Sequence, residues 1–229
     1  MVAHFCGPSE RRDLLEIGAG MGGNLCLGSG FRSVTALDPS LVSCDYLRGL
    51  SPPVTVLQES WPRMDTSLES RFDVIFLLDV LEHLDDDMES LGSIYHSLRK
   101  DGDLLLTVPA YQWMWSTHDE RLHHKRRYVK REIIGKLRRA GFDIVFNSYF
   151  TTLLLPFAIV QRFMMKFGLR SKISPPKGKT NSFRFKSLHQ LIASFLAVER
   201  FIVRTIGLPF GLSIVVIARK SGHSQNSLS

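Results

Sequence analysis

Residues 13 to 22 read Asp-Leu-Leu-Glu-Ile-Gly-Ala-Gly-Met-Gly. The apolar residues between Leu14 and Ile17 predict a short buried strand, which breaks abruptly into a run of glycines. Glycine accepts the backbone angles of a tight turn and lets a ligand lie on main-chain N–H groups at the start of a helix. A strand, a glycine turn and a helix in this order open a doubly wound α/β fold. The stretch therefore predicts a nucleotide-type cofactor.

The glycine spacing alone leaves the kind of cofactor open. Gly18, Gly20 and Gly23 also satisfy the G-x-G-x-x-G pattern of dinucleotide sites. Glu16, however, stands at the strand end, where a dinucleotide fingerprint normally carries an apolar residue. An NAD-dependent oxidoreductase is therefore the remote alternative.

Three further landmarks follow the glycine turn. A second strand ends as Ala-Leu-Asp-Pro at 36–39, residues 72–83 read Phe-Asp-Val-Ile-Phe-Leu-Leu-Asp-Val-Leu-Glu-His, and residues 98–109 read Leu-Arg-Lys-Asp-Gly-Asp-Leu-Leu-Leu-Thr-Val-Pro. With these motifs the chain resembles the class I S-adenosylmethionine-dependent methyltransferases, in particular bacterial members with E-I-G-x-G and D-V-L-E-H motifs. The resemblance covers about 13–148 and a last strand near 212–219.

Short apolar strands alternate with segments of helical period, which predicts βαβ units and a mostly parallel sheet. The resemblance implies the same class: α/β, doubly wound, with a mostly parallel seven-stranded Rossmann-like sheet and a helical insertion between the last two strands. We expect strands at 14–18, 33–37, 54–57, 72–77, after Gly102, at 142–146 and at 208–220. We expect helices at 21–29, after Pro39, at 84–98, at 129–140 and at 187–205, and a polar-aromatic loop at 110–129.

The helix at 84–98 has a predicted start and end. Asp86 and Glu89 have the spacing of a capping box, and Gly102 predicts the point where the helix closes.

The chain divides into four expected regions. Residues 1–148 form the S-adenosylmethionine-binding core, 149–210 a helical insertion that caps the substrate site or faces a membrane, 211–220 the final core strand, and 221–229 a disordered tail. Only a dozen residues precede the first strand, where relatives usually carry a lid of one or two helices. We therefore expect either a more open site or a truncated start of the chain.

Composition places the chain among globular proteins that work in a reducing compartment. Its 229 residues fit one domain, with 44% hydrophobic and 22% charged residues. The 3 cysteines show neither a disulfide framework nor metal spacing. Neither a secretory leader nor an apolar run of membrane-spanning length is recognisable. We expect a cytoplasmic protein that can associate peripherally with the inner membrane face.

The net charge of +7 hides a strong asymmetry between the two halves. Residues 1–120 carry 8 Lys and Arg against 19 Asp and Glu, which gives 8 − 19 = −11. Residues 121–229 carry 21 against 3, which gives 21 − 3 = +18. The basic half predicts an anionic substrate, an anionic membrane surface or a nucleic acid. Nucleic acid is the less favoured of these, because aromatic and cationic residues are not interleaved.

The resemblance assigns the amino-acid end of S-adenosylmethionine to the first turn. Gly18, Ala19 and Gly20 would approach it closely. Glu16 matches the acid of the family motif, which shapes the loop and meets the ammonium group through water.

The resemblance assigns the rest of the cofactor to later strand ends. Asp38 would accept both ribose hydroxyls, because one carboxylate can bind a diol through two oxygens. Leu78 and Asp79 end the fourth strand beside the sulfonium. Glu59 would hold the adenine amino group, with Gln58 as a second candidate and an ordinary solvated acid as the alternative for Glu59.

Residues 108–128 resemble those of a subgroup with an aromatic run, then His-Asp-Glu, then His-x-Arg-Arg-Tyr. A loop after the fifth strand faces the transferable methyl group in this fold. Aromatic rings can wall an acceptor pocket, and guanidinium groups match phosphate or carboxylate. The predicted substrate-binding residues are Tyr111, Trp113, Trp115, Arg126, Arg127 and Tyr128, with core packing and a solvated helix face as alternative roles.

His83, His118 and His124 are the candidates for a general base, because imidazole titrates near neutral pH. His83 can instead cap the helix after the fourth strand. Methyl transfer can also proceed by alignment alone. The histidines and Asp119 show no recognisable metal-ligand spacing, so we expect no metal.

The sequence favours a methyltransferase that acts on a small or lipid-linked, anionic acceptor. The apolar segment 149–167, followed by eight basic residues and no acidic one over 162–186, is typical of an interfacial membrane contact. An RNA methyltransferase and a non-catalytic S-adenosylmethionine-binding scaffold are the alternatives.

Overall fold

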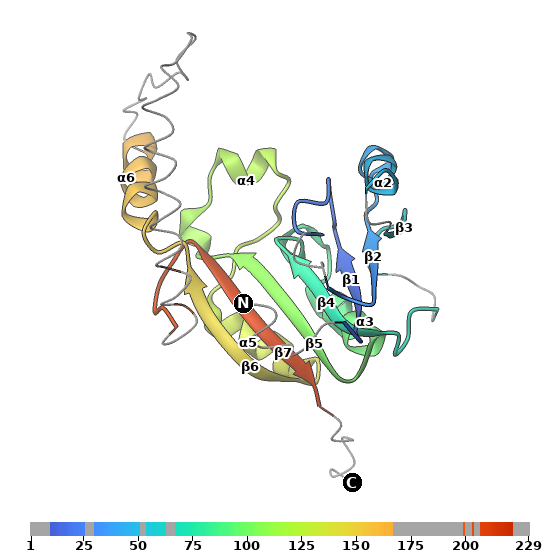
Figure 1. Ribbon diagram of the computed structural model, residues 1–229. Helices are drawn as coiled ribbons and strands as arrows, with labels where there is room; N and C mark the ends of the chain where they lie inside the picture. The colour runs from blue at the N-terminus through green and yellow to red at the C-terminus, as the bar shows by residue number, and fades with distance from the viewer. Residues whose placement is uncertain are drawn as a thin grey trace.

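Seven strands form one mixed sheet in the order β3-β2-β1-β4-β5-β7-β6 (Figure 1). The computed structural model describes residues 10–25, 30–50, 54–62, 67–166, 199, 203 and 207–221. The parallel strands are β1 (Asp13–Ile17), β2 (Ser33–Leu37), β3 (Thr55–Leu57), β4 (Phe72–Leu78) and β5 (Leu98–Pro109). Strand β7 (Ser213–Lys220) runs antiparallel between β5 and β6 (Phe142–Phe150). The predicted seven-stranded, mostly parallel α/β fold is confirmed.

The central strands are mostly apolar and buried, as expected for parallel strands inside an α/β sheet, although β1 also carries Asp13 and Glu16. Every residue of β1 is buried, and β4 carries Val74, Ile75, Phe76 and Leu77 with no exposed surface. Strands β2 and β3 follow β1 on one side of it, and the chain then crosses back to place β4 on the other side of β1. Between these strands lies the topological switch point, where open α/β sheets bind ligands.

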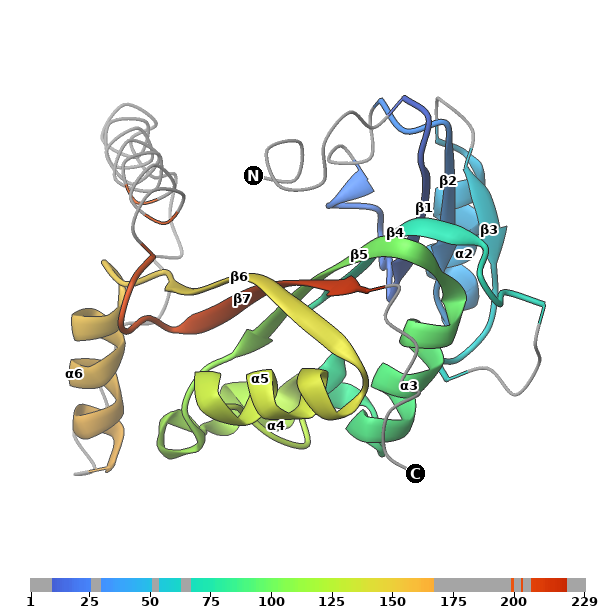
Figure 2. The same ribbon diagram turned by 90° about the horizontal axis from the view of Figure 1, so that it is seen from below.

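Two helices cover one face of the sheet, α3 (Asp87–Ser97) and α5 (Lys130–Arg139) (Figure 2). Leu91 and Ile94 of α3, together with Ile133 and Leu137 of α5, are fully buried against the sheet. Among the described residues, the other helical elements are α2 (Leu41–Arg48), η2 (Leu81–His83), η3 (Gln112–Met114), α4 (Thr117–Arg121) and α6 (Leu155–Lys166).

The predicted cap of α3 is present at its start, but its predicted end is wrong. The Asp86 carboxylate accepts hydrogen bonds from the N–H groups of Met88 and Glu89. The helix ends at Ser97, and Gly102 lies inside β5. The helix ends before Gly102 because of strand pairing: Leu98 already pairs with Phe72 of β4. Tertiary hydrogen bonds here override the local capping signal.

Three further expectations need correction. Residues 21–25 form turns, and 26–29 of the predicted helix 21–29 lie outside the described residues. The predicted loop 110–129 contains η3 and the short helix α4, which begins at a capping box between Ser116 and Asp119. Strand β6 also continues past Phe146 to Phe150, because it pairs with β7 along its length.

Helix α6 is the described part of the expected insertion. The predicted helix at 187–205 lies outside the described residues apart from Glu199 and Val203, and the tail 221–229 lies outside them apart from Ser221. Within the described residues, every helix is too short or too polar to cross a bilayer.

Candidate cofactor-binding and active site

The turn after β1 is tied to the end of β2 by backbone hydrogen bonds. The N–H of Gly18 donates to the Leu37 carbonyl at 2.8 Å, and that of Ala19 donates to the same oxygen at 3.2 Å. The N–H of Gly20 donates to Asp38 Oδ2 at 2.8 Å. Gly18 and Gly20 have φ values of +70° and +53°, which glycine adopts without strain. The turn therefore has a fixed shape beside Asp38.

A cavity of about 640 Å³ opens at the carboxyl ends of β1, β2 and β4. This is the switch point of the sheet, and the volume suits a nucleoside-sized ligand. Its lining includes Gly18, Asp38, Trp61, Asp79, Val80 and His83.

Two features of the strand and turn next to this crevice, at residues that are not among those lining the cavity, fit the amino-acid end of S-adenosylmethionine. A Cβ atom placed on Gly20 would meet no atom within 4 Å, so this part of the turn faces open space. The Glu16 side chain is buried, and neither of its carboxylate oxygens makes a hydrogen bond among the described residues. Burial raises the pKa of Glu16 to about 7, against a lowering influence of nearby Asn24. An ammonium group, directly or through water, would supply the missing donor.

Asp38 lies where a ribose-binding acid is expected. It is 7% exposed and lines the cavity, while Oδ1 accepts from the Ser40 N–H at 2.9 Å and Oδ2 from Gly20. Each carboxylate oxygen can accept a second hydrogen bond. The two backbone donors therefore orient the carboxylate and leave capacity for both hydroxyls of a diol.

Of the other predicted cofactor residues, only Asp79 is among those that line the cavity. Asp79 lines the cavity with φ +54°, whereas Leu78 packs against the apolar cluster that contains Phe76. Glu59 is exposed and is not among the cavity-lining residues. The sequence reasoning missed Trp61, whose ring lines the cavity and whose Nε1–H donates to the Ser90 carbonyl. An aromatic residue so soon after β3 was the available signal.

The predicted aromatic wall is only partly assembled. The ring of Tyr111 stacks on Trp113 at 5.7 Å and on Tyr149 of β6 at 5.3 Å between ring centroids. Trp113 is 61% exposed and Trp115 is partly exposed. Tyr111 and Trp113 therefore offer an aromatic surface beyond the end of β5.

The other predicted substrate ligands have protein partners. Arg127 is almost buried, with Nε donating to Asp119 at 2.7 Å and Nη1 to the Ala110 carbonyl. Arg126 donates to the carbonyls of residues 84 and 85. Tyr128 is 1% exposed and donates to Asp87. Tyr128 is thus a core residue, and the two arginines fasten the 122–128 segment to its neighbours.

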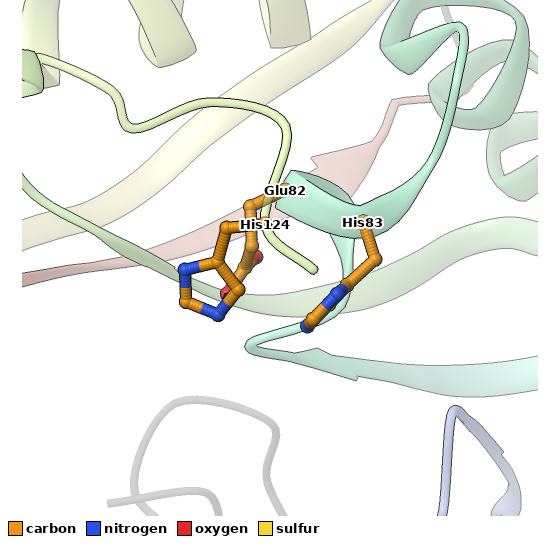
Figure 3. A group of neighbouring side chains, drawn as sticks. All are labelled: Glu82, His83 and His124. Atoms are coloured by element: carbon orange, nitrogen blue, oxygen red, sulfur yellow. Dashed lines mark ion pairs between the residues drawn. The ribbon is translucent and has the colours of Figure 1, made fainter. Parts of the chain in front are cut away.

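Two of the three predicted histidines lie together, and the third does not. His83 and His124 contact each other edge to face, with ring centroids 4.7 Å apart, and Glu82 lies beside them (Figure 3). His118 lies on α4 with an exposed side chain. Only His83 lines the cofactor cavity.

The electrostatics around this pair are unusual. Burial, together with neighbouring His124, lowers the pKa of His83, so its imidazole is neutral near pH 7. Burial raises the pKa of Glu82 to about 8. Burial also raises the pKa of Asp79. Burial opposes ionisation of Asp119 as well, but hydrogen bonds from Arg127, His124 and Ser116 hold its pKa at about 2.

A family model described as a methyltransferase domain matches residues 3–146. The chain belongs to this methyltransferase family. S-adenosylmethionine is its cofactor, and the open glycine turn, the Glu16 carboxylate and Asp38 described above fit that molecule.

Solved methyltransferases share the fold at low sequence identity. The S-adenosylmethionine-dependent methyltransferase of Mesorhizobium loti superposes with a TM-score of 0.62, at 13% identity over 95% of each chain. The phosphoethanolamine N-methyltransferase 2 of Haemonchus contortus, solved with S-adenosylmethionine, gives 0.57 at 15% identity over 96% of this chain and 51% of that one.

Curated relatives match part of the sequence. The tRNA U34 carboxymethyltransferase of Shewanella baltica is 32% identical over 116 residues, 46% of this chain. The matched segment of the chain spans 34%, about a third, of that relative's length.

Proposed function

We propose that this methyltransferase acts on an amphipathic, lipid-linked acceptor with an anionic group at a membrane surface. The observation that carries the proposal is an exposed apolar surface on α6 and the turn before it. Large apolar side chains are exposed there to between 38% and 70%, namely Leu153, Leu154, Phe157, Val160, Phe163 and Met164. An apolar helix face beside a basic sequence is what an interfacial contact requires.

The position of α6 supports a link between this surface and the active site. Both α6 and α4 lie beyond the carboxyl ends of the parallel strands, on the cofactor side of the sheet (Figure 1). Arg162 of α6 has its Nη2 3.9 Å from Asp119 Oδ2, and Asp119 in turn contacts His124. A lipid-anchored acceptor bound by α6 would have its polar end near the cavity that includes His83.

In this proposal the chain binds and aligns its substrates. Asp38 and the Gly18–Gly20 turn orient the cofactor, and Tyr111 with Trp113 forms one wall of the acceptor path. Bound S-adenosylmethionine would supply the electrophilic methyl group and keep the electrons of its C–S bond on sulfur, and these residues would hold the acceptor's nucleophilic atom in line with that bond.

Flotation with phosphatidylcholine vesicles, with and without phosphatidylglycerol, tests the membrane contact. We expect binding to the anionic vesicles that weakens at high salt and is lost when Phe157→Ser and Val160→Ser are combined. Val145→Ser, at an exposed apolar position of β6, is the matched control and should bind normally. Labelled S-adenosylmethionine should then transfer its methyl group into the lipid extract. Absence of both binding and labelling would refute the proposal.

A second candidate acceptor is RNA, which the tRNA-modifying relatives and the basic C-terminal half favour. An assay of methyl transfer from labelled S-adenosylmethionine to total tRNA distinguishes an RNA acceptor from a lipid acceptor. Methyl incorporation into tRNA, with RNA binding that falls steeply with salt, would replace the lipid proposal.

A further inference from the structure

Glu82 is a buried carboxylate without a donor. It has no exposed surface, and neither Oε1 nor Oε2 has a hydrogen-bond partner among the described residues. Taking a carboxylate out of water is costly unless a cation or several donors compensate it. The nearest recorded side-chain nitrogen is Nε2 of His124, which lies 3.9 Å from Oε1. The space between these side chains is therefore one where either a proton or a bound cation has to compensate the carboxyl group.

Three potential ligand atoms converge on this space. Glu82, His83 and His124 each present one, and all three atoms lie within 4.8 Å of one another (Figure 3). The two segments that carry them are joined by a backbone hydrogen bond of 2.8 Å, from the N–H of Lys125 to the Glu82 carbonyl. The grouping is thus built by the fold, across about 40 residues of sequence.

Asp119 orients His124 as a metal-binding histidine is usually oriented. Its Oδ1 lies 3.0 Å from His124 Nδ1, so that nitrogen carries the proton and Nε2 keeps a lone pair on the side of Glu82. Arg127 and the N–H and hydroxyl of Ser116 hold Asp119 in place. A chain of buried contacts therefore fixes the tautomer and the ring plane.

We infer that Glu82, His83 and His124 form a binding site for a divalent transition metal ion. Two imidazoles and one carboxylate are the ligand set of borderline cations such as Zn²⁺, Mn²⁺ and Fe²⁺, which also leave positions open to substrate. Zn²⁺ holds such ligands at about 2.0–2.2 Å, so a modest rotation of the partly exposed His83 would close the site.

The site borders the cofactor cavity, since His83 lines it together with Gly18, Asp38 and Asp79. A metal there would offer its open positions to an oxygen of the acceptor and would lower the pKa of a bound hydroxyl. This consequence rests on the proposed function; metal binding itself does not. It would also make His83 and His124 ligands, in place of the general-base role expected from the sequence.

Titration calorimetry with Zn²⁺ on the metal-stripped full chain tests the site. We expect one tight site that weakens at least tenfold in Glu82→Gln and His124→Ala. His96→Ala, which removes an exposed histidine of α3, is the matched control and should bind like the original protein. Equal Zn²⁺ affinity in all four proteins would assign the metal to other histidines and overturn the proposal, as would no binding at all.

Locating the metal in the original protein tests the site even if a variant fails to fold. An anomalous difference map of the original protein soaked in Zn²⁺ should show a peak between Glu82, His83 and His124. A peak elsewhere, or none, would overturn the assignment whatever the variants do. Neither measurement uses a methyl acceptor, so failure of the lipid proposal would leave this result unaffected.

Discussion

The backbone N–H of Gly20 donates a 2.8 Å hydrogen bond to Asp38 Oδ2, across 18 residues of sequence. The glycine turn after β1 and the acid after β2 are therefore one rigid unit. If S-adenosylmethionine binds as we expect, it meets groups for its amino-acid end and its ribose end that are already aligned. Such preorganisation limits the ordering cost of binding.

Asp38→Asn should weaken S-adenosylmethionine binding about 10- to 100-fold, because hydrogen bonds to a charged group contribute about 1.5–3 kcal/mol. Asp38→Ala should weaken it further, since the N–H groups of Gly20 and Ser40 lose their acceptor. Calorimetry measures both effects. Asp45→Asn on α2, whose recorded ion pair is with Arg48 at the surface, is the control. Equal binding by Asp38→Ala and the original protein would remove Asp38 from the site.

Substitutions of two glycines in the same turn should have different effects, one mainly on stability and the other mainly on cofactor binding. At Gly18 a Cβ atom would lie 2.5 Å from Val80 Cγ2, so Gly18→Ala should lower the free energy of unfolding by about 2 kcal/mol or more. At Gly20 the methyl group would enter open space, so Gly20→Ala should cost about 1 kcal/mol of strain but markedly weaken cofactor binding. Urea unfolding and calorimetry give the two quantities.

Gly92→Ala on α3 is the matched control for these glycine variants. Its added Cβ meets nothing within 4 Å and its φ is not positive, so the change should be neutral or stabilising. Similar losses of stability in Gly18→Ala and Gly92→Ala would contradict the steric argument.

Glu16 should make the stability of the cofactor-free protein depend on pH. Burial raises its pKa from an ordinary 4.5 to about 7. The folded state therefore binds the proton more tightly than the unfolded state, and stability falls as the pH rises from about 4.5 to 7. Glu16→Gln removes this titration, so its melting temperature relative to the original protein should rise between pH 5 and pH 8. The corresponding gain in the free energy of unfolding, relative to the original protein, is roughly 3 kcal/mol. A pH-independent difference would show that Glu16 titrates normally.

Asp119 should be a major determinant of stability. It is fully buried and pairs with Arg127, whose side chain is 8% exposed, so Asp119→Ala leaves a buried guanidinium unpaired. Breaking such a pair costs about 3–5 kcal/mol, which urea unfolding would detect. Asp85→Asn is the control, because its ion pair with Lys125 is exposed to solvent and should leave the stability almost unchanged. A loss below about 1 kcal/mol in Asp119→Ala would contradict this assignment.

Local patterns predicted the sheet and the cofactor crevice well. Strand ends such as Ile17 and Leu37 directly precede the candidate residues Gly18, Gly20 and Asp38, so their place at the ends of β1 and β2 could be predicted from neighbours in the chain. Parallel strands place their carboxyl ends at one edge of the sheet, which brings these residues together in any sequence of this pattern. The start of α3 at Asp86 was predictable for the same reason: its capping partners lie two and three residues away.

The acceptor side was not predictable in this way. Arg127 and Tyr128 looked like substrate ligands, but their partners Asp119 and Asp87 satisfy them inside the protein. Gly102 looked like a helix end, but strand pairing placed it inside β5.

The sequence by itself determined a doubly wound sheet with a glycine turn and an acid at its switch point, because hydrophobic period and turn chemistry act over a few residues. Only the tertiary structure decided that Glu82 and His83 would face His124, about 40 residues away, and that the Glu82 carboxyl would be buried without a recorded hydrogen-bond partner among the described residues. Such a grouping depends on how the segment after α4 folds back on η2. That path is set by the summed packing and hydrogen bonding of the whole domain, which no local pattern encodes.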